Sequence, residues 1–374
     1  MISKLDLERI LEREDGDTPV LSLYLDMSVN SDNKRTYGVF LGQKQSQFEE
    51  LDSHRPNHPV EAIGEAFTRV QEWIDREFNE ANRGVVIFTE VGGDWFEALQ
   101  FPVPVQNRMI VNARPYIAPL AQVLESYQHH GVILIDREHV RLLSVYLGTL
   151  LDEIEVHGKP LPTPHDVQAG GYSAPRYQRR KREEMRHFFR EFAKEVEVFV
   201  QRYQPDDLVI LGTEENISRF REFLPERIQQ MVVYTGPTRV DEPASQVMAG
   251  IEGQLEAERA RCSEELVDAL RERVEQDYLA TAGFQSTLSA LQEGKVDTLV
   301  IARDQDQEGA RCPRCGFLFA RDVESCPYDG AETVTGIDVV DEAIRMAEAQ
   351  GAEVEFVNPS TVSDLRGVGA LLRF

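Results

Sequence analysis

The hydrophobic and polar positions of this 374-residue chain switch repeatedly between helical and strand-like spacing. Apolar residues spaced for one helical face predict an amphipathic helix over residues 2–11. Short apolar runs predict strands at 19–25, 84–88 and 95–99, and a longer periodic stretch predicts a helix near 62–79. Alternating helices and strands are typical of an α/β domain, which we assign to residues 1–128.

A second domain, assigned to residues 129–278, begins with three closely spaced apolar runs at 131–136, 140–146 and 150–156. The short connections between these runs predict an antiparallel meander. From Met185 to Tyr203, apolar and aromatic residues recur at three- and four-residue steps, which predicts a helix with one core-facing stripe. A strand at 208–211 and further helices, the last near 253–278, complete the domain.

The third domain, assigned to residues 279–374, combines helices and strands around an insertion that contains cysteines. One helix ends near Glu293, where Gly294 provides a stop, and a second is predicted over 339–350. Strands are predicted at 298–302, 354–357 and 369–374. The chain is therefore expected to be of the α/β (α+β) class, with three domains.

The formal net charge of −25 argues against a protein that coats nucleic acid along its whole surface. A local contact with RNA remains compatible with this charge, because salt screens charges beyond about 10 Å. The first residues lack the pattern of a signal peptide, and no apolar run approaches the roughly 20 residues that span a bilayer. We therefore expect a soluble, cytoplasmic protein with neither membrane nor DNA as a partner.

The sequence from residue 170 to residue 182 concentrates positive charge behind two glycines: Gly-Gly-Tyr-Ser-Ala-Pro-Arg-Tyr-Gln-Arg-Arg-Lys-Arg. Paired glycines allow the backbone to approach a ligand closely, and clustered arginines attract phosphate. A solvated basic helix start beside a flexible loop is the structural alternative. We favour an RNA contact, with the candidate binding residues Gly170, Gly171, Tyr172, Arg176, Arg179, Arg180, Lys181 and Arg182.

Three of the four cysteines lie close together, which indicates metal binding rather than a disulfide framework. Cys312 and Cys315 form a Cys-x-x-Cys turn followed by glycine, and Cys326 and Asp329 repeat the spacing in a second turn followed by glycine. This pattern predicts a zinc ribbon over about 311–331, with these four residues as ligands of a closed, structural Zn²⁺ site. The alternatives are a site completed by water or a relic without metal. Cys262 lies in a helical pattern and is expected to be a small buried residue.

These features together resemble the archaeo-eukaryotic class-I release factor and Pelota superfamily, most closely its bacterial and archaeal branch, which includes ribosome hibernation factors of the Balon type. The middle domain carries the resemblance most clearly, because residues 170–179 read Gly-Gly-Tyr-Ser-Ala-Pro-Arg-Tyr-Gln-Arg where release factors read Gly-Gly-Gln-Ser-Ala-x-Arg-Phe-x-Arg. The resemblance implies a release-factor/Pelota-like first domain and a ribonuclease-H-like middle domain. It also implies a third αβα domain like kink-turn-binding ribosomal proteins, which often carries a zinc ribbon.

Two departures from the family pattern affect the expected function. Tyr172 occupies the position of the glutamine that, in release factors, helps to place water at the ester between peptide and tRNA. Gln168 and His165 lie upstream and could be proposed as substitutes for that glutamine. A glutamine or histidine in a loop is, however, usually just solvated. The first domain also lacks the Asn-Ile-Lys-Ser motif of stop-codon recognition, and Asn33-Lys34-Arg35 is only a polar loop.

The leading hypothesis is a non-hydrolytic factor, not an enzyme, that binds ribosomal RNA in the A site of the ribosome. The resemblance implies ribosome hibernation or protection, with a translational GTPase such as elongation factor Tu as a partner of the third domain. The alternative is a peptidyl-tRNA hydrolase or a ribosome rescue or release factor that uses the same loop. A third hypothesis, a zinc-bearing interaction module unrelated to ribosomes, requires the match at 170–179 to be chance.

Overall fold

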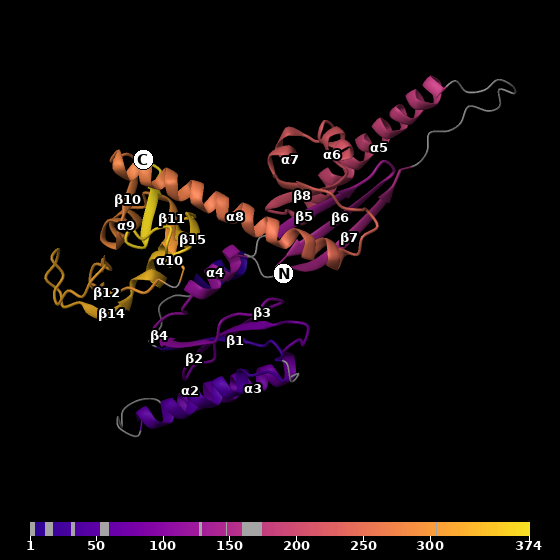
Figure 1. Cartoon of the computed structure of the whole chain (residues 1–374). Coiled ribbons are helices and arrows are strands. Elements are labelled where there is room, and N and C mark those ends of the chain that lie inside the picture. Colours follow the sequence, from indigo (N-terminus) through magenta and orange to yellow (C-terminus); the bar gives the residue numbers. More distant parts are fainter. Residues whose placement is uncertain are drawn as a thin grey trace. The chain divides into compact units, whose positions relative to one another are not determined.

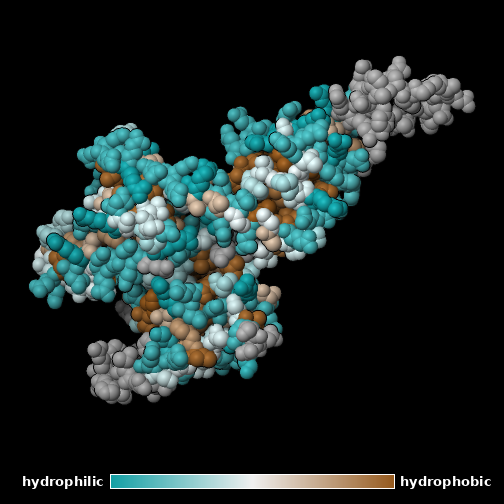
Figure 2. Space-filling view, in the orientation of Figure 1, coloured by the Kyte–Doolittle hydropathy of each residue, from teal (hydrophilic) through white to brown (hydrophobic). Residues whose placement is uncertain are grey.

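The computed structural model describes residues 4–11, 18–30, 34–52, 60–126, 129–146, 148–158, 174–303 and 305–374 (Figure 1). By its internal contacts the chain divides into two compact units. One unit combines residues 1–126 with 263–374, and the other comprises residues 127–262. Hydrophilic residues cover most of the face shown in Figure 2, as the strongly charged composition leads one to expect. Within the described part of the chain, no helix has both the length and the apolar character needed to cross a bilayer.

The first domain is a four-stranded antiparallel sheet with the strand order β3-β2-β1-β4. Its strands are β1 (Val20–Asp26), β2 (Gly84–Glu90), β3 (Phe96–Phe101) and β4 (Arg108–Asn112). Two helices, α2 (Tyr37–Asp52) and α3 (Val60–Glu77), cover one face of this sheet (Figure 1). Leu23 and Leu25 of β1 pack there against Phe67 and Val70 of α3. Two short helices, α1 (Lys4–Leu11) and α4 (Ala118–Ser126), complete the domain.

The middle domain is a five-stranded sheet with the order β7-β6-β5-β8-β9. The strands β5 (His129–Ile135), β6 (His139–Tyr146) and β7 (Thr149–His157) form the predicted antiparallel meander. The strands β8 (Asp207–Gly212) and β9 (Val232–Gly236) join the sheet parallel to β5. Three antiparallel strands followed by two parallel ones is the ribonuclease-H-like topology that the resemblance implied.

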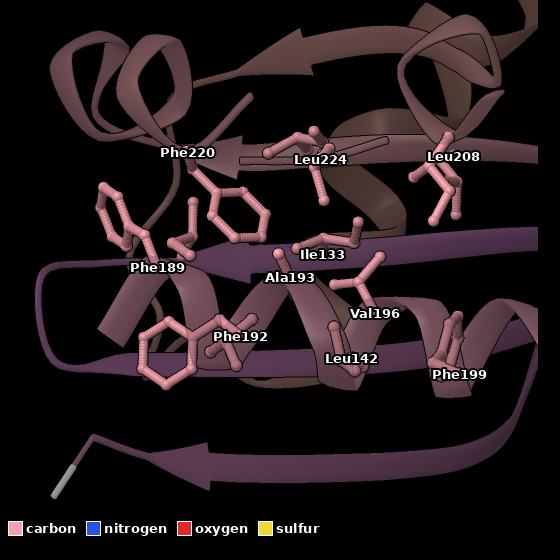
Figure 3. Close-up of a cluster of buried hydrophobic side chains, with 14 of the residues drawn as sticks. Ile133, Leu142, Phe189, Phe192, Ala193, Val196, Phe199, Leu208, Phe220 and Leu224 are labelled. Atoms are coloured by element: carbon pink, nitrogen blue, oxygen red, sulfur yellow. The ribbon is translucent and has the colours of Figure 1, made fainter. Parts of the chain in front are cut away.

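Both faces of the middle sheet are buried. The long helix α5 (Ala174–Tyr203) packs on one face together with α6 (Glu214–Arg221) and α7 (Glu226–Gln230). Phe189, Phe192 and Phe199 of α5 fill this core with Ile133 and Leu142 of the sheet (Figure 3). On the other face lies the first half of α8 (Ala244–Glu275), which contributes buried aliphatic side chains. The continuous apolar runs of β5 and β8 follow from this two-sided burial.

The third domain is a four-stranded mixed sheet with the order β10-β16-β11-β15. It contains β10 (Ala280–Ala282), β11 (Val296–Ala302), β15 (Glu353–Val357) and β16 (Val368–Leu372), with the helices α9 (Phe284–Gln292) and α10 (Val339–Ala349). Between β11 and α10, a separate three-stranded sheet is built from β12 (Glu308–Arg311), β13 (Leu318–Phe319) and β14 (Val334–Asp338). The second half of α8 packs on the four-stranded sheet through Val267 and Leu270.

The mixed α/β class is confirmed, and most predicted strands and helices agree with the structure to within a few residues. The helix α8 is the exception, because it begins at Ala244 and the prediction placed its start near 253. The helix α2 was not predicted, because its apolar residues Val39, Phe40 and Leu41 are consecutive rather than periodic. The boundary at residue 278 stays a prediction. It falls after α8, whose first half packs on the middle sheet and whose second half packs on the third-domain sheet.

One expectation was wrong. Cys262 is exposed on α8 and not buried. Its sulfur lies 3.9 Å from a guanidinium nitrogen of Arg261 and 4.0 Å from Oε1 of Glu258. The segment of α8 around Cys262 is rich in charged residues. The apolar character of the thiol alone was therefore not enough to predict burial at this position.

Candidate nucleic-acid interface and metal centre

The predicted RNA-binding arginines lie in the first turns of α5, directly behind the glycine loop. The helix begins at Ala174 and contains 30 residues, so its length is about 45 Å at 1.5 Å per residue. The backbone of residues 176–182 belongs to this helix. Gly170, Gly171 and Tyr172 lie outside the described residues, as do His165 and Gln168. The structure therefore defines the helix that follows the loop and leaves the loop itself a prediction.

The aromatic stripe of α5 fixes the helix to the middle sheet. Phe188, Phe189 and Phe192 are buried, and the ring of Phe189 makes an edge contact with Phe220 of α6 (Figure 3). It makes a second edge contact with Phe223. Contacts with the core begin at Met185, whose sulfur is approached by the guanidinium of Arg219. In Figure 1 the turns before this point extend past the edge of the sheet. The first turns of α5 therefore precede the part of the helix whose described side chains pack on the sheet.

Beyond the basic turns, the exposed side of α5 carries charges of both signs, because Glu183 and Glu191 are exposed as well as the arginines. Arg186 and Arg190 are both exposed and stand one turn apart, opposite the buried phenylalanines. The N-terminal end of a helix also carries a partial positive charge, which adds to the attraction for phosphate.

A glycine that sequence reasoning missed brings β7 close to α5 at the base of the loop. A Cβ atom at Gly158 would lie 2.6 Å from Cδ1 of Phe188, so no larger residue fits without movement of the ring. At the same end of the sheet, His139 and His157 are cross-strand partners with ring centroids 4.7 Å apart. Nδ1 of His139 lies 3.0 Å from Oδ2 of Asp136. Burial opposes ionisation of Asp136, but hydrogen bonds from the side chain and backbone of His139 hold the pKa of its carboxyl below the usual value.

These residues were not found from the sequence because they come from different strands, and only the register of β6 with β7 places them together. The glycine directly after β7 was the one available signal.

The predicted metal ligands are brought together in two turns beside the three-stranded sheet of the third domain. One ligand atom from each of Cys312, Cys315, Cys326 and Asp329 lies within 4.8 Å of every other. The two turns have the same backbone geometry, because the N–H of Gly316 donates to the carbonyl of Cys312 at 2.9 Å and that of Gly330 to Cys326 at 2.9 Å. Both glycines have positive φ, 75° and 71°, which explains why glycine follows each turn.

The spacing of the donor atoms fits a tetrahedral ion. Sγ of Cys315 and Sγ of Cys326 are 3.7 Å apart, and Sγ of Cys312 lies 3.5 Å from Oδ2 of Asp329. Tetrahedral zinc with Zn–S bonds of about 2.3 Å places its sulfur ligands about 3.8 Å apart. Burial raises the pKa of the Cys312 thiol, but hydrogen bonds from the backbone of Cys315 and Arg314 outweigh this effect and lower it. A backbone hydrogen bond from Phe317 lowers the pKa of the Cys315 thiol, but burial and the side chains of Cys312 and Cys326 outweigh it and raise this pKa to about 11. The cluster by itself therefore favours a thiolate at Cys312.

Comparisons with known proteins agree with this architecture. Residues 115–256 match the family described as bacterial archaeo-eukaryotic release factor family 10, and residues 261–374 match eRF1 domain 3. The chain is 25% identical over 315 residues to peptide chain release factor subunit 1 of Pyrococcus abyssi, with 73% of each chain covered. It is 22% identical over 417 residues to the subunit 1 of Methanocaldococcus jannaschii, covering 98% of this chain and 96% of that protein. A solved structure of S. cerevisiae Dom34, a translation termination-like factor, is 8% identical with a TM-score of 0.43, covering 75% of this chain and 73% of that one.

The fold and the two family matches define a multidomain protein of the release-factor type. The chain belongs to the archaeo-eukaryotic release factor and Pelota superfamily, in its bacterial and archaeal branch.

Proposed function

We propose that this protein is a translation factor that enters the ribosomal A site and places the loop at Gly170 and Gly171 against ribosomal RNA. The observation that carries the proposal is the position of α5. The helix begins at Ala174, directly behind the loop, and its aromatic stripe anchors it from Met185 onward. Arginines in an otherwise acidic chain are thereby concentrated at the end of a rigid support.

We further propose that binding occurs without hydrolysis and serves to protect or park idle ribosomes. Support comes from Tyr172, which replaces the glutamine of the family motif and carries no amide to orient water. The named relatives are peptide chain release factors, and this favours the alternative, in which the loop releases peptide or rescues stalled ribosomes. The two functions differ in one observable, the release of peptide from peptidyl-tRNA.

The third domain supports two smaller proposals. We propose that Cys312, Cys315, Cys326 and Asp329 hold a structural Zn²⁺, which would tie the two turns of the insertion together without taking part in chemistry. We also propose a translational GTPase, such as elongation factor Tu, as a partner of this domain. The match of residues 261–374 to eRF1 domain 3 supports a docking role there.

Sedimentation of purified protein with ribosomes tests the main proposal. The wild-type protein should travel with ribosomal particles in a sucrose gradient, and a variant with Arg179, Arg180 and Arg182 changed to glutamate should remain at the top. The matched control changes Arg221, Arg227 and Arg239, which lie in the same domain but not on α5. If both triple variants bind like the wild type, α5 is not the contact. If both lose binding equally, net charge rather than the loop determines it.

A further inference from the structure

A network of buried charges joins the first domain to the third domain within their common unit. Asp341, Glu342 and Arg345 of α10 are at least nine-tenths buried, although each is charged at neutral pH in water. Such groups are almost never buried unless they are paired. Their partners lie more than 190 residues away in the sequence or in the neighbouring small sheet, at Arg114–Ala118 and Arg311.

The carboxylate of Asp341 caps the N-terminus of α4. Its Oδ1 accepts hydrogen bonds from the backbone N–H groups of Ile117 at 2.7 Å and Ala118 at 2.8 Å. Ile117 occupies the cap position, because its carbonyl accepts the N–H of Ala121, and its own side chain has no acceptor. A helix normally caps itself with a nearby serine, threonine, aspartate or asparagine. Here the third domain supplies the cap for the helix that ends the first domain.

Other charged side chains hold α4 at both ends. Arg345 donates to the carbonyl of Pro115 and lies 3.6 Å from Oδ2 of Asp341. At the C-terminal end of α4, Arg303 of the third domain donates to Oγ of Ser126 at 3.1 Å, and its guanidinium lies 3.6 Å from Glu125.

The ion pairs beside the cap complete the network. Glu342 lies 3.6 Å from the guanidinium of Arg114 and also pairs with Arg311. Among the described residues, Nε of Arg345 and Nε of Arg311 have no hydrogen-bond partner. A buried polar network that is only partly satisfied contributes less stability than a full one, so it can open more readily.

We infer that Asp341 is a latch that holds α4 on the third domain and so makes the first and third domains one body. This inference goes beyond the proposed function and does not depend on it. With the latch closed, α4 is helical and packs on α10 and β15 of the third domain. With the latch open, α4 loses its cap and the first domain is free to separate from the third. A helix of nine residues is too short to persist in water by itself, so release of the cap also unfolds it.

The energetic character of the site fits a reversible contact. Burial raises the pKa of Asp341 to about 7, although Arg345 and the amides of Ala118 and Ile117 favour its ionised form. Keeping this carboxylate away from water therefore carries a large desolvation cost, and removing any partner leaves a charge uncompensated. An apolar contact of the same area has no such dependence on a few partners.

Hydrogen exchange measured by mass spectrometry on the full chain tests the latch. Asp341→Ala should accelerate exchange in peptides from 117–126 by roughly tenfold, as expected for the loss of a helix cap, and leave peptides from β11 and β15 unchanged. Small-angle scattering should show a larger radius of gyration for the variant than for the wild type. Asp341→Asn keeps the acceptor oxygen and removes the charge, so it should give a smaller acceleration in the same peptides.

Thr213→Ala is the matched control, because Thr213 caps α6 in the other unit through its side chain. It should leave exchange in α4 and the radius of gyration unchanged. Wild-type protection of α4 in both Asp341 variants would overturn the inference. If Asp341→Ala accelerates exchange throughout the first and third domains, that variant has lost its fold. Hydrogen exchange of Asp341→Asn then tests the latch. A rise confined to α4 then supports the latch, and wild-type protection there contradicts it.

Discussion

At the scale of single residues, Tyr172 separates the two functions proposed for the loop. Hydrolysis of an ester requires an oriented water and a donor at the developing oxyanion, and a phenol replaces the amide side chain here. An aromatic ring is suited to stacking on an exposed base, a contact worth about 1–3 kcal/mol. We expect no release of labelled peptide from ribosomes that carry peptidyl-tRNA, and weaker ribosome binding by Tyr172→Ala.

Tyr172→Gln is the informative companion variant, because it restores the residue of the family motif. We expect it to regain at most weak release, since the rest of the loop must also be positioned. Robust release by the wild-type protein that disappears on changing Tyr172 or Gly171 would contradict this prediction and establish the hydrolase.

His129 provides a pH-dependent prediction at the same scale. Burial lowers the pKa of this histidine below its ordinary value, and Nε2 lies 2.8 Å from Oγ of Ser144. The unfolded chain therefore binds a proton more readily than the folded one once the pH falls below about 6.5, and folding stability decreases with acidity. The free energy of unfolding can be measured with urea between pH 7.5 and pH 5, values chosen to bracket about 6.5. It should decrease less with acidity in His129→Gln than in the wild type.

The control for this measurement is His157→Gln, which changes a largely exposed histidine on β7. It should keep the acid dependence of the wild type. Equal slopes for the wild type and the His129 variant would mean that other groups cause the acid sensitivity.

At the scale of structural elements, the two cysteine turns should depend on metal for their fold. Purified protein should contain about one zinc ion per chain by metal analysis, as expected for a four-ligand site. Cys315→Ser should remove the metal and increase proteolysis within 311–331, because metal binding and folding are coupled in such small sites. Cys262→Ser changes the exposed cysteine outside the cluster and should do neither. Absence of metal from protein prepared without chelator would count against the site.

The element scale also shows where patterns in the sequence are reliable. The periodic stripe from Met185 to Tyr203 and the apolar runs of β5 and β8 were predicted because each is a long, regular signal. The helix α2 and the short strand β4 were missed, since burial of their residues depends on partners elsewhere in the chain. The contact of Gly158 with Phe188 likewise requires the packing of α5 on the sheet.

At the scale of the whole molecule, the charge distribution predicts a salt-sensitive association with the ribosome. The chain repels phosphate with a net charge of −25, and we expect attraction to be confined to the basic turns of α5. Each phosphate contact contributes about 0.7–0.9 to the slope of log affinity against log salt. Reversal of Arg179, Arg180 and Arg182 should therefore reduce the slope by about 2–3 and weaken binding at low salt most.

Sedimentation of extracts from growing and starved cells separates the proposed physiological roles. A hibernation or protection factor should accompany ribosomal particles mainly in starved cells. A factor that remains with particles only during growth would favour rescue or release. A slope that is unchanged in the triple variant would show that RNA is contacted elsewhere.

The sequence by itself determined the class of fold and pointed to the glycine motif with its arginines and to four candidate metal ligands. These are local patterns: periodicity, a motif of ten positions and a repeated turn, each carried by residues that are close in the chain. Only the tertiary structure decided that Cys262 is exposed, that Gly158 packs against Phe188, and that Asp341 caps a helix more than 220 residues away. The physical reason is that burial and long-range hydrogen bonds arise from packing between elements, which no local spacing encodes.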